Sequence, residues 1–342
     1  MKLEIEERVF HFRQPAGTSR GVYHERRSWM VRASEPGGAA GTGAAIVGGV
    51  GECAPLPDLS CDARADYGQV LRRFCDEVEL SGQIPYDALR DYPSMLFGLE
   101  TALLSLPDSA FSRGEVGIPI NGLVWMGSYE EMLARMEQKL EQGFRCVKLK
   151  IGAIDFDREL DLVRRIRQRF SHHEVELRLD ANGAFPFDEA LYKLELLSQY
   201  NIHSIEQPIR QGQWALMAEL CRESPLPIAL DEELIGVNDP DLKRQLLNII
   251  KPQYIVLKPS LHGGMMGTRE WVALARDMQI GSWITSALES NVGLRAVAGL
   301  CADIYGDRIT TPQGLGTGQL FTDNIPMPLE IRGDELWTLK NS

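Results

Sequence analysis

The chain has 342 residues, 44% of them hydrophobic and 25% charged, which is an ordinary composition for a globular protein with one large and one smaller unit. Its formal net charge of −12 argues against a nucleic-acid partner and against binding to an anionic membrane surface. No apolar stretch approaches the roughly 20 residues needed to cross a bilayer, and the N-terminal residues lack a signal-peptide core. We therefore expect a cytoplasmic protein that acts on a small molecule, and the sequence leaves its oligomeric state open.

The cysteines are consistent with a reducing compartment. The six of them are scattered along the chain and show no Cys-x-x-Cys spacing. In a chain of this length we expect reduced, partly buried thiols rather than a disulfide framework or a zinc site.

The first part of the chain, residues 1–110, has the pattern of a mixed α+β module. Strand patterns occur near 2–12, 28–33 and 44–50, and helical patterns occur near 63–79 and 93–106. A loose loop is expected at 14–21. The glycine-rich tract at 36–51 lacks the Gly-Lys-Ser/Thr ending of a phosphate-binding loop, so we interpret it as a flexible hairpin connection.

Beyond this module, predicted strands and helices alternate. A short buried strand is predicted at 118–124, and Ser128 with Glu131 has the spacing of a capping box at the start of the next helix. Gly143 stands where the C-terminus of that helix favours a left-handed residue. After a further strand, a helix is predicted at 156–170, with apolar residues on one side.

Charged or polar residues end the successive predicted strands at nearly constant intervals. They are Lys150, Asp180, Glu206, Asp231, Lys258 and Ser286, and a last strand is expected near Thr311. Short connections between alternating strands and helices indicate a parallel sheet, and a closed barrel explains why such groups recur at every strand end. We therefore predict an α/β fold: a modified (β/α)7β TIM-like barrel over 111–322, capped by the α+β module, with a tail at 323–342 that returns to the cap.

Three of the strand-end groups are carboxylates from consecutive units: Asp180, Glu206 and Asp231. Their flanking motifs contain no histidine or cysteine, and hard oxygen ligands favour Mg²⁺, or alternatively Mn²⁺, over zinc. Each acid alone has the ordinary explanation of a helix cap or a salt bridge. Three of them in consecutive units, flanked by lysines, favour a divalent-metal site.

Lysines stand on both sides of these acids. Lys148 and Lys150 share one face of their predicted strand, because side chains alternate with period two. Adjacent ammonium groups repel and a metal adds to the repulsion, so one of the two could be a general base near neutral pH. The alternative is a solvated lysine pair, but Val147 and Leu149 on the other face indicate a packed strand. Lys258 should approach from the opposite side, and together these groups permit metal-assisted proton abstraction next to a carboxylate.

Five motifs in this order resemble the enolase superfamily, in its muconate-lactonising subgroup. They are Lys-x-Lys at 148–150, Asp-x-Asn-Gly at 180–183, Glu-Gln-Pro at 206–208, Asp-Glu-Glu at 231–233 and Lys-Pro-Ser at 258–260. Each motif is weak alone, whereas the ordered set is specific, and the resemblance covers cap, barrel and tail. It implies an enolase-like capped barrel in which Asp180, Glu206 and Asp231 bind Mg²⁺.

Two further segments, 285–293 and 312–318, resemble members of the subgroup with one particular lyase activity. That activity is the syn dehydration of 2-succinyl-6-hydroxy-2,4-cyclohexadiene-1-carboxylate to an aromatic product in menaquinone biosynthesis. By this resemblance Lys150 removes the proton alpha to the ring carboxylate and returns it to the leaving hydroxyl. Lys258 stabilises the enediolate through a cation–π contact, and Lys148 tunes Lys150.

The candidate substrate contacts are less specific. Arg178 and Asn182 flank the first acid, although a salt bridge to a neighbouring metal ligand would explain Arg178 equally well. Ser286, Gly314 and Gly316 are candidates for the succinyl carboxylate, through a hydroxyl and backbone N–H groups. A tight turn is the alternative explanation for the two glycines.

Substrate choice is where the prediction has its closest rivals. Cap segments at 18–20 and 52–56 resemble loops that close over the site and select the substrate. A dipeptide epimerase would use the same lysines, but such enzymes usually carry an acidic pair after the last barrel strand, and residues 314–318 contain no acid. An N-succinylamino acid racemase remains an alternative, because its substrate also carries a succinyl carboxylate. A barrel without catalysis would be expected to have lost one of the charged residues, and all are intact.

Overall fold

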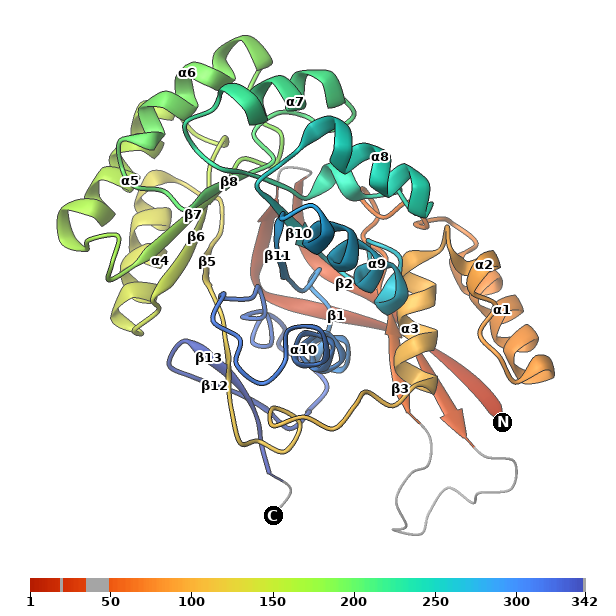
Figure 1. Ribbon diagram of the computed structural model, residues 1–342. Helices are drawn as coiled ribbons and strands as arrows, with labels where there is room; N and C mark the ends of the chain where they lie inside the picture. The colour runs from red at the N-terminus through yellow and green to blue at the C-terminus, as the bar shows by residue number, and fades with distance from the viewer. Residues whose placement is uncertain (19–20, 35–48, 341–342) are drawn as a thin grey trace.

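The structure is a computed structural model in which residues 1–18, 21–34 and 49–340 are described (Figure 1). A parallel sheet is surrounded by helices, and an antiparallel sheet with its own helices packs beside it. The α/β barrel with an α+β cap that the sequence predicts is therefore confirmed.

The cap is built on an antiparallel sheet. It consists of β1 (Lys2–Thr18), β2 (Gly21–Ser34) and β3 (Val50–Cys53), and its helices are α1 (Tyr67–Ser81), α2 (Tyr86–Leu89) and α3 (Pro93–Leu103). The prediction of a loose loop at 14–21 is wrong within the described residues, because β1 and β2 continue there and Ala16 pairs with Tyr23 after a register shift. Most of the glycine-rich tract at 36–51 lies outside the described residues.

The barrel strands pair in chain order and all run parallel. They are β5 (Gly122–Val124), β6 (Cys146–Lys150), β7 (Glu176–Asp180), β8 (Ser204–Glu206), β9 (Ile228–Leu230), β10 (Tyr254–Leu257) and β11 (Gly281–Ile284). Between and after them come α4 (Tyr129–Glu141), α5 (Phe156–Arg169), α6 (Phe187–Ser198), α7 (Trp214–Glu223), α8 (Pro240–Ile250), α9 (Gly264–Asp277) and α10 (Asn291–Tyr305), and a 3-10 turn, η1 (Glu232–Leu234), follows β9.

Side-chain alternation explains how the barrel is packed. In β6, Val147 and Leu149 are fully buried in the main hydrophobic core, whereas Lys148 and Lys150 point the other way. Figure 1 shows α4 to α8 as an arc outside the strands. The apolar side chains thus hold the helices to the sheet and leave the lysines for the barrel interior.

The barrel is closed by an extended segment just after Thr311, near which the sequence predicts the last strand. Gln313 forms a parallel bridge with Ile120, and Gly314 forms one with Thr285. Backbone hydrogen bonds accompany both bridges. The closing segment therefore lies between the first and the last strands of the sheet, two to three residues later than the sequence predicts.

The strand predicted at 118–124 is divided in two. Its first part, β4 (Ile118–Pro119), leaves the barrel and pairs with β13 (Glu335–Thr338), which in turn pairs with β12 (Leu329–Arg332). The tail also contacts the cap, where the His11 N–H of β1 donates to the Asp323 carboxylate at 2.8 Å. The C-terminal residues thus contact both β1 and β4.

The helix signals read from the sequence are confirmed at α4. Ser128 Oγ accepts the Glu131 N–H at 3.3 Å, and the Glu131 carboxylate accepts the Ser128 N–H at 2.8 Å. Gly143 has a φ of 85° just beyond the helix end. Among the described helices none is long and apolar enough to span a membrane, and the cysteines are free thiols, buried except for Cys61.

Candidate functional site

The candidate site is a cavity at the carboxyl ends of the barrel strands, beside the cap. Lys148, Lys150, Asp180 and Lys258 are among the residues that line it. Register explains why residues from separate strands meet here: Lys150 is paired with Asp180, and Asp180 is paired with Glu206. In parallel strands such partners lie side by side on one face of the sheet.

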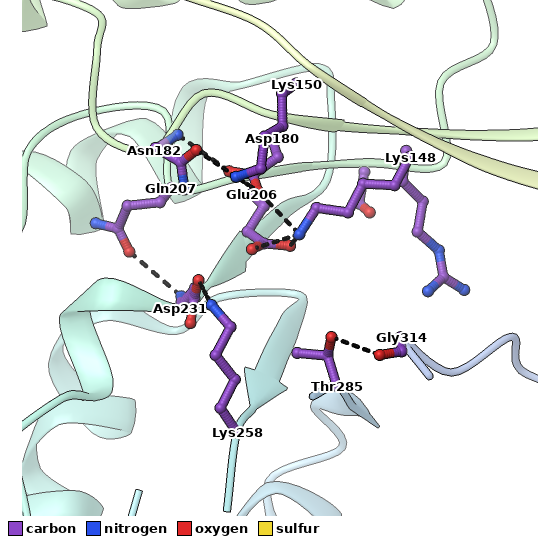
Figure 2. A network of polar contacts seen from close by, with 12 residues as sticks. Lys148, Lys150, Asp180, Asn182, Glu206, Gln207, Asp231, Lys258, Thr285 and Gly314 are labelled. Atoms are coloured by element: carbon purple, nitrogen blue, oxygen red, sulfur yellow. Dashed lines mark hydrogen bonds and ion pairs between the residues drawn. The ribbon is translucent and has the colours of Figure 1, made fainter. Parts of the chain in front are cut away.

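The two lysines of β6 contact the acids of the next strands (Figure 2). Lys148 Nζ lies 2.8 Å from Asp180 Oδ2 and 2.7 Å from Glu206 Oε2. Lys150 Nζ lies 3.1 Å from Asp180 Oδ2 and donates to Asn182 Oδ1 at 2.6 Å. Lys148 therefore bridges two carboxylates, whereas Lys150 is held at the cavity by one carboxylate and one amide.

Lys258 reaches the same cavity from the other side. It follows β10, and its Nζ forms an ion pair with Asp231, which follows β9. In Figure 2 its side chain rises toward Asp231 from the side opposite Lys150. The sheet order places β7, β8 and β9 between β6 and β10, so the three acids lie between the two lysines.

Burial and charge together set the protonation of this cluster. Burial lowers the pKa of Lys148, but Asp180 and Glu206 outweigh it, so the pKa is raised above its usual value. At Lys148 the two acids therefore outweigh any repulsion from Lys150. Burial also opposes charge on Lys258, and there the pKa is raised because Asp231 and Glu206 favour the ammonium form.

The donor set suits a hard divalent cation. Asp231 Oδ1 and Glu232 Oε2 are buried and have no hydrogen-bond partner within the described part of the chain. Such orphaned carboxylate oxygens are costly unless a cation or donor meets them. As the side chains stand, no cluster of three or more His, Cys, Asp or Glu in the described residues is close enough to hold a metal, because Lys148 and Lys258 pair with the acids instead.

Two residues of the site were not singled out from the sequence. Glu232 lines the cavity and accepts from Asn182 Nδ2 at 2.8 Å, and burial, followed by the charge of Asp231, raises its pKa to about 7. Gln207 accepts the Asp231 N–H at 3.3 Å and so fixes the end of β9. Both residues belong to motifs identified in the sequence, Glu-Gln-Pro and Asp-Glu-Glu. Nothing in the sequence indicated that Glu232, and not Glu233, would line the cavity.

The predicted substrate contacts divide into two groups. Asn182, Ser286, Gly314 and Gly316 line the cavity. Arg178 does not: it is buried inside the barrel, its Nε donates to Glu176 at 2.7 Å, and its guanidinium stacks on a tryptophan ring at 4.3 Å. The structure therefore places Arg178 in a salt bridge, but its partner is Glu176 and not one of the candidate metal ligands.

The cap contributes one wall of the cavity. Tyr23 and Leu56 line it, and Leu56 belongs to the segment at 52–56 expected to close over the site. Of the other expected segment, residues 19 and 20 lie outside the described residues. The wall from the cap is thus partly apolar, opposite the charged strand ends.

The family profile described as "Enolase C-terminal domain-like" matches residues 131–333, which is more than half of the chain. The chain therefore belongs to the enolase superfamily, as the ordered motifs indicate. It is 44% identical to the o-succinylbenzoate synthase of Desulfotalea psychrophila, over 97% of this chain and 98% of that one.

Solved structures agree with this assignment. The crystal structure of MenC from Desulfotalea psychrophila LSv54 has a TM-score of 0.80 at 40% identity, covering 99% of both chains. A dipeptide epimerase from Enterococcus faecalis, complexed with Mg and the dipeptide L-Leu-L-Tyr, also has a TM-score of 0.80, covering 99% of this chain and 96% of that one. At 17% identity the second likeness shows the fold alone.

Proposed function

We propose that the protein is an o-succinylbenzoate synthase, a lyase that dehydrates 2-succinyl-6-hydroxy-2,4-cyclohexadiene-1-carboxylate to 2-succinylbenzoate in menaquinone biosynthesis. The observation that carries the proposal is the placement of Lys150 and Lys258 on opposite sides of one cavity, with three acids between them. The identity of 44% to a synthase over nearly the whole chain supports the choice of substrate.

In this proposal Lys150 is the base. Its Nζ lies at the cavity surface, where Asn182 and Asp180 orient it by hydrogen bonds. The neutral amine takes the proton alpha to the ring carboxylate, and the resulting ammonium gives that proton to the hydroxyl that leaves from the same face. The products are water and the aromatic compound. Lys150 returns to its neutral form, because it gives the leaving hydroxyl the same proton that it took from the substrate.

Lys258 and Lys148 act through charge. Lys258 lies across the cavity from Lys150, where its ammonium group stabilises the enediolate anion and the ring by a cation–π contact. Lys148 lies beside Asp180, which also contacts Lys150. Through this shared carboxylate we propose that Lys148 tunes the basicity of Lys150.

Asp180, Glu206 and Asp231 would hold Mg²⁺, with Mn²⁺ as the alternative. When bound, such a cation stabilises negative charge on the substrate carboxylate. The unpartnered oxygen of Asp231 supports this assignment. Binding requires the ammonium groups of Lys148 and Lys258 to shift away from the acids, which would lessen the stabilisation of their charge.

The succinyl carboxylate is proposed to lie near Ser286 and the closing segment. The Ser286 hydroxyl donates to Glu289 at 2.6 Å, and the Gly314 N–H donates to the Ile284 carbonyl at 2.9 Å. Within the described residues the Gly316 N–H has no acceptor. Gly316 is therefore the best placed of the three to donate to an incoming carboxylate.

We further propose the domain division that the sequence suggests. Residues 1–110 are the capping domain, 111–322 the catalytic barrel and 323–342 the tail. The cap supplies Tyr23 and Leu56 to the cavity, so it excludes water and helps to select the substrate.

The rival function with a specific observation in its favour is N-succinylamino acid racemisation. A lysine on each face of the substrate is also what exchange of an alpha proton requires. Epimerisation of dipeptides is less favoured, because Gly314, Gly316 and Thr317 line the cavity where a substrate amine would need an acid.

One assay separates these functions. Purified protein is given the cyclohexadiene substrate and, separately, N-succinylamino acids and dipeptides, and kcat/KM is compared in the presence of Mg²⁺. We expect the dehydration to be preferred by several orders of magnitude. A higher kcat/KM for racemisation would overturn the proposed function.

A further inference from the structure

A buried arginine joins the cap to the barrel at the wall of the cavity. Arg26 lies on β2, and its side chain is almost fully buried, with 2% of its surface exposed. Its guanidinium donates to the carbonyls of Ala54 and Pro55 in the cap. A buried cation needs such partners, because loss of hydration is otherwise expensive.

The same guanidinium also reaches the barrel. Arg26 Nε donates to the Leu288 carbonyl at 3.3 Å, and Nη2 donates to the Ala287 carbonyl at 3.4 Å. Ala287 and Leu288 follow β11, more than 200 residues away in the chain. One side chain therefore ties together two backbone segments from the two domains.

Both segments continue directly into the cavity wall. Leu56, next to Pro55, lines the cavity, as do Ala287 and Leu288. Leu56 and Ala287 also pack in one small hydrophobic cluster. The position of this apolar wall relative to the lysines thus depends on how the two segments are held.

Leu288 holds a conformation that needs support. Its φ is 65°, in the left-handed region, which is costly for a residue with a Cβ. Its carbonyl accepts from Arg26, and its N–H donates to Ser286 Oγ at 3.2 Å. These two hydrogen bonds fix the peptide groups on either side of the strained residue.

Nearby carboxylates balance the charge but do not compete for these donors. Glu52 accepts from Ser28, Ser290 and Gly293, and Glu289 accepts from Ser260, Ser286 and Ala287. The guanidinium donors are therefore free for backbone carbonyls. A planar fork of N–H groups suits this task, whereas a lysine ammonium offers a single point of attachment.

We propose that Arg26 is a positioning residue that holds cap segment 54–56 against barrel segment 286–288 and thereby sets the apolar wall against which the substrate binds. The inference rests on the proposed function only in taking this cavity as the substrate site. It assigns Arg26 no contact with the reacting atoms. Its loss should therefore weaken substrate binding much more than it slows the chemical step.

The test compares Arg26→Met with Arg90→Met. Arg90 also joins cap to barrel, donating to the Asn238 carbonyl at 3.1 Å and to Glu270, but it does not line the cavity. Arg26→Met should raise KM roughly tenfold and leave kcat within about threefold of the wild-type value. This pattern is expected when a variant loses binding energy that the substrate and the transition state share equally. Arg90→Met should lower the melting temperature with KM unchanged.

Arg26→Lys tests the geometry apart from the charge. It keeps a buried cation but not the fork, so it should fold and still show a raised KM. A KM within about twofold of wild type in either folded Arg26 variant, or the failure of both variants to fold, would overturn the positioning role. An equal rise of KM in Arg90→Met would do the same.

Hydrogen exchange separates this inference from the proposed reaction. Amides at 54–60 and 286–292 should exchange faster in Arg26→Lys than in wild type or Arg90→Met, with or without substrate. If the wild-type protein does not dehydrate the cyclohexadiene substrate, the proposed function fails, while the exchange comparison still decides the role of Arg26.

Discussion

Lys150 and Lys258 line one cavity from opposite sides of the barrel interior. The strands between theirs carry Asp180, Glu206 and, just after β9, Asp231. Each lysine is anchored to an acid of this set: Lys150 to Asp180 and Lys258 to Asp231. The arrangement gives a proton acceptor on one face of a bound molecule and a positive charge on the other. The proposed dehydration requires both.

Replacing either lysine should abolish turnover. We expect Lys150→Ala and Lys258→Ala each to lower kcat by about a thousandfold or more, since general acid–base groups and preorganised charges contribute on that order. The measurement is the rate of formation of the aromatic product, with circular dichroism to show that each variant is folded. Lys193→Ala is the control, because Lys193 pairs with Glu189 on the outer helix α6 and should leave the rate unchanged. Turnover within about tenfold of wild type in either variant would refute the assigned roles.

Removal of divalent metal should also abolish activity. Treatment with a chelator should stop dehydration, and Mg²⁺ should restore it, with Mn²⁺ as an effective substitute. Asp231→Asn removes one charge from the proposed ligand set and should weaken Mg²⁺ binding by roughly tenfold or more, measured by calorimetry. Full activity in the chelated protein would show that the acids do not serve a metal.

The closing segment should tolerate no side chain at Gly314. A Cβ there would stand 2.0 Å from Thr285 Oγ1 and 3.1 Å from Thr285 Cα, so the barrel closure would have to open. Gly314→Ala should therefore lower both the melting temperature and the activity. Gly316→Ala is the matched control, since its nearest neighbour would be the Asn121 carbonyl at 3.3 Å and the effect on stability should be smaller. Equal stability of wild type and Gly314→Ala would contradict the observed packing.

Glu100 should make stability depend on pH. It is buried in α3 and accepts the backbone N–H groups of Met265 and Met266 at the start of α9, and burial raises its pKa from 4.5 to about 7. Between these values the folded protein binds more protons than the unfolded one. Its contribution to the free energy of unfolding therefore falls as pH rises from about 4.5 to about 7, by roughly 1.4 kcal/mol per pH unit at most.

Glu100→Gln removes this titration while keeping one acceptor oxygen. Urea unfolding of both proteins across pH 4.5–8 should show a shallower decline for the variant in that interval. Other carboxyl groups with a raised pKa, such as that of Asp62, contribute equally to both proteins. Their contributions cancel in the difference between the two free energies of unfolding. Parallel pH profiles would mean that Glu100 does not titrate in this range.

Much of the barrel was predictable because its signals are local. Alternation with period two placed Lys148 and Lys150 on the inner face, and the capping box at Ser128 and the left-handed Gly143 marked the ends of α4. The regular interval between strand-end residues predicted that Asp180 and Lys258 would share one edge of the sheet. These features depend on neighbouring residues or on the repeat itself.

Other features depended on partners far away in the chain. The surroundings of Arg178 were decided in part by the Pro312 carbonyl and by the Trp283 ring on β11. The closing segment was decided by hydrogen bonds to Ile284 and neighbouring residues. The raised pKa of Lys148 likewise comes from acids on two other strands. Local repulsion between the two lysines alone would favour the opposite direction.

The sequence by itself determined the family, the order of the charged residues and the end of the barrel at which they lie. Motif order and strand alternation depend only on residues that are close together in the chain. Only the tertiary structure decided which acid each lysine contacts and which residues face the cavity. It also decided that Arg26 joins the two domains beside the left-handed Leu288. Those outcomes follow from distances and buried charges between segments that have no fixed spacing along the chain.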